Sequence, residues 1–228
     1  AVAEYTVALM LSLNRKIPRA SWRTKDGNFS LHGLMGFDMH GKTAGIIGTG
    51  KIAKILIHIL KGFGMNILAY DLYPDYNFAR EEKIVYTSLD ELYHSSDIIS
   101  LHCPLTEATK YLINDYSISK MKDGVMIINT GRGQLIHTNA LIEGLKNKKI
   151  GSAGLDVYEE ESEYFYEDQS DRIIDDDVLA RLLSFNNVIV TSHQAFFTHE
   201  ALENIAMTTL QNIRDFINHK PLLNEVKK

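Results

Sequence analysis

Residues 43–53, with the sequence TAGIIGTGKIA, decide the fold of this chain. A short apolar segment leads directly into GTGKIA at 48–53, which has the pattern G-x-G-x-x-A. In such a pattern Gly48 permits a tight turn, Gly50 lets a diphosphate approach the backbone, and the small Ala53 lets helix and strand pack closely. The pattern therefore predicts a strand, a turn and a helix whose N-terminus binds the phosphates of a dinucleotide.

The residues after this turn have the hydrophobic period of a helix. Gly62 and Gly64 are suited to end that helix. Its apolar positions recur every three or four residues: Ile52, Ile55, Leu56, Ile59, Leu60 and Phe63. The next apolar stretch, NILAYD at 66–71, has the composition of a second strand.

Asp71, at the end of that second strand, indicates which dinucleotide is bound. A carboxylate about 20 residues after the glycines accepts hydrogen bonds from the ribose hydroxyls of NAD and repels the 2′-phosphate of NADP. Leu72 and Tyr73 follow it, so there is no arginine at this place to receive such a phosphate. We therefore expect NAD as the cofactor. The alternative is that Asp71 only caps the junction between strand and loop.

Strand-like and helical patterns alternate along the rest of the chain. Further apolar, strand-like runs occupy 84–87, 97–103, 125–130, 151–157 and 187–192. Helical patterns occupy 88–95, 138–148, 176–184 and 198–218. This alternation predicts an α/β fold with a doubly wound parallel sheet, and the nearly continuous apolar character of the strands predicts helices on both faces. The last helix either packs on this domain or crosses to a second one.

The composition excludes several classes of protein. With 24 basic and 29 acidic residues, the net charge of −5 lacks the basic patch typical of a nucleic-acid-binding protein. No apolar run reaches the roughly 18 residues of a membrane span. Cys103 is the only cysteine, so no internal disulfide can form, and we expect a reducing, cytoplasmic location. The acidic residues of 156–177 lack the ligand spacing of a calcium loop, so no metal site is expected.

Polar side chains follow three of the predicted strands. Arg132 comes after the strand at 125–130, His193 comes after the strand at 187–192, and three glutamates at 159–161 follow GLDV. In open α/β sheets, ligands bind at the carboxyl ends of the strands. A guanidinium can hold the carboxylate of a 2-keto acid by two hydrogen bonds, and an imidazole can protonate its ketone oxygen as hydride arrives. A carboxylate beside that imidazole would orient it, but the spacing leaves open which glutamate does so. Taken singly, each of these residues could equally be a surface or structural group.

Six stretches of the chain together resemble the NAD-dependent D-2-hydroxyacid dehydrogenase family. They are NFSLHGLMGFDMHGKTAGIIGTGKIA, LKGFGMNILAYD, ISLHCPLT, NTGRG, GLDVYEEE and HQAF, and they occur in the family's order. The resemblance implies hydride transfer between NAD and a D-2-hydroxyacid or 2-keto acid, with D-lactate and pyruvate as the expected pair. It also implies that Arg132 anchors the substrate, that His193 is the acid–base group and that Glu161 supports it.

The resemblance further implies which residues contact the cofactor. Besides the motif glycines Gly48 and Gly50, the pyrophosphate would be near Lys51 and Ile52, and the ribose near Asp71. The adenine side would be walled by Cys103, Pro104 and Thr109. The nicotinamide half would lie near Thr130, Gly131, Arg132, Asp156 and His193.

The resemblance also predicts the domain organisation. Residues 1–196 would form the dinucleotide-binding domain, with a leading helix at 1–17. Residues 197–228 would belong to a second, flavodoxin-like substrate domain, most of which would precede residue 1. We therefore expect either a fragment or a truncated relative of the enzyme, paired as a homodimer through the helix at 1–16.

Three other functions remain open from the sequence. The chain could act on another D-2-hydroxyacid. It could be an NAD-sensing module like the corepressors that resemble this family, or a nucleotide-binding fragment that is inactive by itself. Oxidation of NADH on addition of pyruvate distinguishes the enzyme from the NAD-sensing module and from the inactive fragment.

Overall fold

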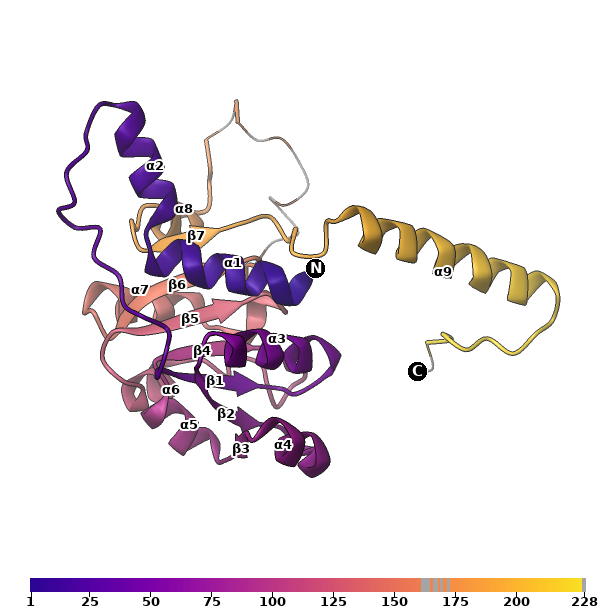
Figure 1. Ribbon diagram of the computed structural model, residues 1–228. Coiled ribbons are helices and arrows are strands. Elements are labelled where there is room, and N and C mark those ends of the chain that lie inside the picture. Colours follow the sequence, from indigo (N-terminus) through magenta and orange to yellow (C-terminus); the bar gives the residue numbers. More distant parts are fainter. Residues whose placement is uncertain (161–164, 166–167, 169, 172, 227–228) are drawn as a thin grey trace.

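The computed structural model describes residues 1–160, 165, 168, 170–171 and 173–226. Its centre is one parallel sheet with the strand order β3-β2-β1-β4-β5-β6-β7 (Figure 1). The strands are β1 (Thr43–Ile47), β2 (Asn66–Tyr70), β3 (Val85–Tyr86), β4 (Ile98–Leu101), β5 (Val125–Asn129), β6 (Ile150–Leu155) and β7 (Val188–Val190). The predicted doubly wound α/β fold is confirmed, since the strand order reverses direction at β1.

Helices cover both faces of this sheet (Figure 1). The helices of the described residues are α1 (Val2–Asn14), α2 (Ile17–Lys25), α3 (Lys51–Gly62), α4 (Tyr76–Glu82), α5 (Leu89–Ser95), α6 (Asp115–Lys120), α7 (Thr138–Lys146), α8 (Asp177–Leu183) and α9 (His199–Ile217), of which α2 and α9 do not cover the sheet. A short 3-10 turn, Gly133–Leu135, follows β5.

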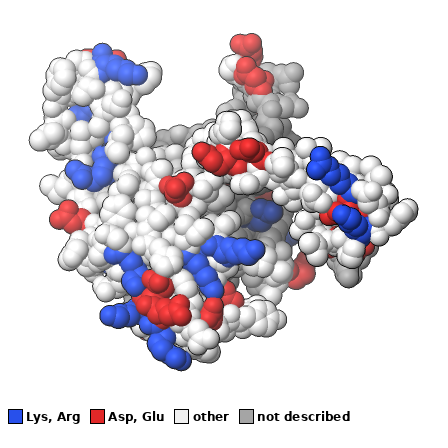
Figure 2. All heavy atoms as spheres, turned by 45° about the vertical axis from the view of Figure 1, so that its right-hand side comes forward, with Lys and Arg blue, Asp and Glu red and all other residues white. Residues whose placement is uncertain are grey.

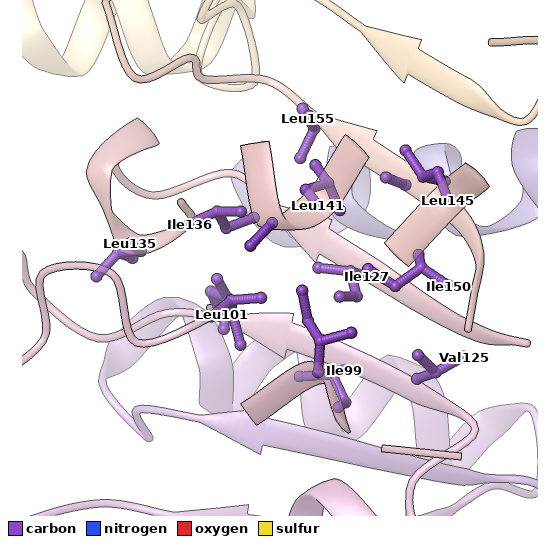
Figure 3. Packing of buried hydrophobic residues seen from close by; sticks show 14 of the residues in the cluster. Ile99, Leu101, Val125, Ile127, Leu135, Ile136, Leu141, Leu145, Ile150 and Leu155 are labelled. Carbon is purple, nitrogen blue, oxygen red and sulfur yellow. The ribbon is translucent and has the colours of Figure 1, made fainter. Parts of the chain in front are cut away.

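Successive residues of the central strands β1, β4 and β5 pack into two separate cores, one on each face of the sheet. On β4, Ile99 and Leu101 belong to the core under α5 to α8, whereas Ile98 belongs to the core under α1 and α3. Figure 3 shows Ile99 and Leu101 pointing toward Ile127 of β5 and Leu141 of α7. Because the strands are buried on both faces, their sequences are apolar at almost every position.

The glycine motif packs as its sequence predicts. Ala53 is completely buried where α3 passes over the sheet, so a larger residue would push the helix away. The apolar positions Leu56, Ile57 and Leu60 are also completely buried. The helix therefore starts directly above the end of β1, and its N-terminus faces the carboxyl edge of the sheet.

The leading helix expected at 1–17 ends at Asn14, and a further helix that was not predicted, α2, begins at Ile17. Lys16 has a left-handed backbone (φ 51°), and Pro18 lies in the first turn of the next helix. The chain therefore turns sharply between α1 and α2. No residue of α2 is buried, and Figure 1 shows α2 standing away from the sheet.

Helix α9 also lies away from the sheet (Figure 1). Thr198 caps its start by accepting a hydrogen bond from the backbone N–H of Ala201. None of its residues is buried, and its apolar side chains are exposed: Leu202, Ile205, Met207, Leu210, Ile213 and Phe216. Among the described residues, no helix combines the length and apolar character needed to span a bilayer.

Candidate functional site

The turn after β1 has one packed side and one open side. Gly48 has a φ of +89°, and a Cβ atom there would lie 2.5 Å from the backbone nitrogen of Cys103. In contrast, a Cβ atom on Gly50 would meet no atom within 4 Å. Gly50 is the residue before the first turn of α3, where backbone N–H groups lack partners in the helix. The open side therefore fits a phosphate group, as the motif predicts.

Gly48→Ala is expected to abolish dinucleotide binding and to lower thermal stability. A side chain at this positive φ costs about 1–3 kcal/mol, and the new methyl group would also displace the backbone of Cys103. NADH titration by fluorescence and thermal unfolding measure the two effects. Gly62→Ala is the matched control, because a Cβ atom there meets nothing within 4 Å. NADH affinity close to that of the unmodified protein in Gly48→Ala would contradict this account of the turn.

Asp71 is held at the end of β2 by three hydrogen bonds. Its carboxylate accepts from the backbone nitrogen of Thr49 at 2.6 Å, the Thr49 hydroxyl at 2.9 Å and the backbone nitrogen of Tyr73 at 2.8 Å. Partial burial alone would raise the pKa of Asp71, but these hydrogen bonds lower it below its ordinary value. A charged carboxylate therefore lies beside the glycine turn, where the ribose of a dinucleotide is expected.

Six of the predicted cofactor residues line one cavity of about 340 Å³: Gly48, Gly50, Asp71, Cys103, Pro104 and Thr109. The remaining wall is mostly apolar and includes Leu72, Leu89 and Leu112. The volume falls within the range of small-molecule pockets, so the cavity fits the adenosine half of a dinucleotide. Two further predicted residues, Lys51 and Ile52, are exposed in the first turn of α3.

The Cys103 thiol and the Thr109 hydroxyl in the wall of this cavity are suited to contact a ligand rather than to react with it. Burial raises the pKa of the Cys103 thiol to about 11, so the thiol stays protonated and unreactive at neutral pH. The Thr109 hydroxyl donates to the carbonyl of Pro104 at 2.7 Å, which closes the loop on itself.

The loop after β5 is shaped by a residue that the sequence analysis missed. Asn129 is buried, and its side chain donates to the carbonyl of Arg132 at 2.9 Å and accepts from the backbone nitrogen of Gly131 at 3.0 Å. The Arg132 side chain is exposed, and it forms no salt bridge with any carboxylate of the described residues. The Arg132 guanidinium therefore retains donors for an anion in the space above the sheet edge.

Asp156 shapes the loop after β7, which carries His193. Asp156 is completely buried, and its carboxylate accepts from the Thr191 hydroxyl at 2.6 Å and from the backbone nitrogens of Gln194 and Ala195 at 2.9 and 2.7 Å. The Asp156 carbonyl accepts from the backbone nitrogen of His193 at 2.7 Å. These bonds hold His193 in a left-handed conformation with φ 54°. The structure thus gives Asp156 a role in presenting His193.

The three glutamates after β6 differ in their surroundings. Glu159 accepts from the Thr138 backbone nitrogen at 3.1 Å, from the Thr138 hydroxyl at 2.8 Å, and from the Tyr111 phenol. Partial burial opposes ionisation of Glu159, but these hydrogen bonds outweigh it and lower its pKa. Glu159 therefore anchors the start of α7. Glu160 is exposed, and the predicted catalytic Glu161 lies outside the described residues.

The loops after β5 and β6 are in direct contact. A Cβ atom on Gly133 would lie 1.8 Å from the carbonyl oxygen of Tyr158. Farther along, the Tyr158 hydroxyl donates to Asp176 at 2.6 Å, just before α8. The residues around Arg132 and those around Glu159 are therefore held at one edge of the sheet, the edge that also carries the glycine turn and the His193 loop.

The described residues contain no group of histidine, cysteine and carboxylate side chains that could hold a metal ion. Positive and negative side chains are interspersed over the face that Figure 2 shows. This face has no continuous basic patch of the kind that binds nucleic acid.

Comparison with known proteins agrees with this geometry. The family model described as "D-isomer specific 2-hydroxyacid dehydrogenase, NAD binding domain" matches residues 7–195. The D-lactate dehydrogenase of Escherichia coli K12 is 53% identical over 226 residues, which are 99% of this chain and 68% of the relative. A 2-hydroxyacid dehydrogenase homologue of Haemophilus influenzae is 55% identical, over 93% of this chain and 64% of the relative.

Comparison with solved structures also finds proteins of this kind. The pyruvate reductase of Chlamydomonas reinhardtii superposes with a TM-score of 0.94 at 46% identity, covering 98% of this chain and 68% of that structure. The chain thus spans about two thirds of the length of the relatives it matches. It belongs to the D-isomer-specific 2-hydroxyacid dehydrogenase family, and residues 7–195 are its NAD-binding domain.

Proposed function

We propose that this protein interconverts pyruvate and D-lactate with NADH and NAD. The observation that carries the proposal is the arrangement at the carboxyl edge of the sheet. There, Asn129 and Asp156 fix the backbones that carry Arg132 and His193, beside the dinucleotide turn at Gly48. Relatives named D-lactate dehydrogenase and pyruvate reductase support the choice of substrate.

Each side chain has a separate role in the proposed reaction. The bound nicotinamide cofactor supplies or accepts the hydride. Arg132 binds the substrate carboxylate through two parallel hydrogen bonds and also polarises the neighbouring carbonyl. His193 donates a proton to the carbonyl oxygen during reduction and removes it again during oxidation. Glu161 holds the imidazole of His193 in the productive orientation.

We expect NAD to bind much more tightly than NADP, because Asp71 would repel a 2′-phosphate. Asp71→Ala should weaken NAD binding by at least about tenfold, the effect of losing a hydrogen bond to a charged group, and should reduce the preference. Since hydrogen bonds hold the pKa of Asp71 below its ordinary value, the preference should persist into mildly acidic solution. Titration with both cofactors measures this, with the exposed Asp90→Ala as control. Equal affinities in the unmodified protein would refute the assignment.

A second, flavodoxin-like domain would complete the active site in our proposal. Two features support it: the chain covers about two thirds of its relatives, and none of the residues of α9 is buried. The first turn of α1 and residues 194–198 line a common cavity, and Figure 1 shows the N-terminus beside the segment that leads into α9. A domain that precedes residue 1 would therefore lie next to α9 and could cover its apolar side chains.

We also propose that the protein is a homodimer in the cytoplasm. The sequence suggested the helix at 1–16 as the contact surface, and one side of α1 is covered by its own domain. We propose that α2 and the segment after it contribute to the contact, because they expose five large apolar side chains: Ile17, Trp22, Phe29, Leu31 and Met35. Large exposed apolar patches of this kind are typical of protein interfaces.

The direct test of the proposed reaction is oxidation of NADH by the full-length protein with a series of 2-keto acids. Pyruvate should be reduced most efficiently, and the product should be the D-isomer. Preference for a larger keto acid would indicate another D-2-hydroxyacid as substrate. Tight NADH binding with no oxidation by any keto acid would contradict the enzymatic function and favour an NAD-sensing module.

A further inference from the structure

Helix α1 makes a hydrogen bond to each of the two loops that carry the proposed catalytic residues. The side-chain amide of Gln194 donates to the Tyr5 hydroxyl at 2.7 Å. The hydroxyls of Thr6 and Thr130 lie 3.1 Å apart in a buried contact. Gln194 is next to His193 in the chain, and Thr130 lies two residues before Arg132. Two adjacent residues of α1 therefore contact both loops.

The direction of the buried hydrogen bond follows from the number of protons. The Thr6 hydroxyl donates its single proton to the carbonyl of Val2 at 2.9 Å. The proton between Thr6 and Thr130 must then come from Thr130. Since Thr6 is completely buried and Thr130 is 9% exposed, water cannot readily replace Thr6 as the acceptor. The backbone before Arg132 is thus tied to α1 by a bond that has no ready substitute.

The helix that makes these contacts is itself firmly fixed. Leu9, Met10 and Leu13 are buried, and α1 packs against α3, β5 and β6. Adjacent residues of a helix project about 100° apart, so Tyr5 and Thr6 can reach loops that follow different strands. These loops follow β7 and β5, which are separated by β6 in the sheet.

We propose that Tyr5 and Thr6 are positioning residues, which hold the Arg132 loop and the His193 loop at a fixed separation. The inference rests on the proposed function, since it matters only if one substrate contacts both loops. A 2-keto acid bound through its carboxylate to Arg132 and through its carbonyl oxygen to His193 spans a fixed distance. A small change in the separation of the loops would misalign the proton donor, and displacements of this kind lower rates strongly.

The structural part of the proposal is tested by amide hydrogen exchange on this chain without substrate. Thr6→Val removes the hydroxyl at nearly constant shape and should accelerate exchange at 129–132 by about tenfold, the effect of one buried hydrogen bond. Tyr5→Phe should accelerate exchange at 191–195 by about threefold, because that bond is exposed. Thr6→Ser keeps the hydroxyl and should restore the rates at 129–132.

Two controls separate positioning from general destabilisation. Thr43→Val makes the same substitution at the amino end of β1, the opposite edge of the sheet, and should leave both loops unchanged. Tyr116→Phe removes a phenol hydroxyl from an exposed residue of α6. Unchanged exchange at 129–132 in Thr6→Val would overturn the proposal. Uniform acceleration throughout the chain would also overturn it, because α1 would then act only on global stability.

The functional part is tested by kinetics of the full-length enzyme. Thr6→Val should lower kcat/KM for the keto acid about tenfold, and Thr6→Ser should recover it. A kcat/KM unchanged in Thr6→Val would overturn the proposal. If the unmodified enzyme reduces no 2-keto acid, the proposed function fails, but the exchange measurement still decides whether α1 orders the two loops.

Discussion

Replacing His193 by glutamine is expected to lower pyruvate turnover by more than about a hundredfold, the lower range for loss of a general acid, while NADH still binds. Glutamine has a similar size and can donate a hydrogen bond, but it cannot transfer a proton. The backbone of residue 193 is held by Asp156 and the neighbouring amides, so the loop should keep its shape in the variant. We expect the cavity around Gly48 and Asp71 to supply most of the NADH affinity, so the affinity should change little.

Steady-state kinetics and NADH titration on the same preparation measure both quantities. His94→Gln is the matched control, because His94 is exposed on α5, which precedes the amino end of β4. The control should have the turnover of the unmodified enzyme. Turnover in His193→Gln within a few-fold of that value would assign the proton transfer to another group.

Most of the fold could be predicted from the sequence, because the strands are buried on both faces. Strong apolar runs and the glycine motif identify β1, β2, β4, β5 and β6, together with α3 and α7. The leading helix was predicted to run to residue 17 because its apolar start gives no sign of the left-handed Lys16 between α1 and α2, and α2 itself was not predicted. The short helices α4 and α6 lack an extended apolar period, and they are defined by the capping side chains of Asp75 and Asn114.

The candidate site could be predicted only in part. Residues that would touch a ligand, such as Asp71, Arg132 and His193, stand in motifs and were identified. Asn129 was not, because a polar residue at the end of an apolar strand gives no sign of whether it faces ligand or backbone. Asp156 was predicted to lie near the nicotinamide half, and its sequence position gave no sign that its carboxylate accepts hydrogen bonds from Thr191, Gln194 and Ala195 around His193. Such backbone-ordering roles depend on contacts between residues far apart in the sequence.

The second large effect concerns the second domain that we propose to complete the active site. The structure has the cofactor turn, an exposed Arg132 and a partly exposed His193. Dehydrogenases that close two domains over the substrate expel water and align hydride donor and ketone. Without the second domain, residues 1–228 should bind NADH but reduce pyruvate at least about a hundredfold more slowly, as expected when reacting groups are poorly aligned.

The most direct test of the whole account compares two chains at saturating NADH with pyruvate as substrate. One is residues 1–228, and the other is the same chain extended at its N-terminus to the length of its relatives. We predict that both bind NADH with similar affinity and that only the extended chain forms D-lactate at an appreciable rate, without any change to Arg132 or His193. Comparable turnover by the two chains would show that the second domain is dispensable. Absence of 2-keto acid reduction by the extended chain, with NADH bound, would contradict the central claim that this protein is a D-2-hydroxyacid dehydrogenase.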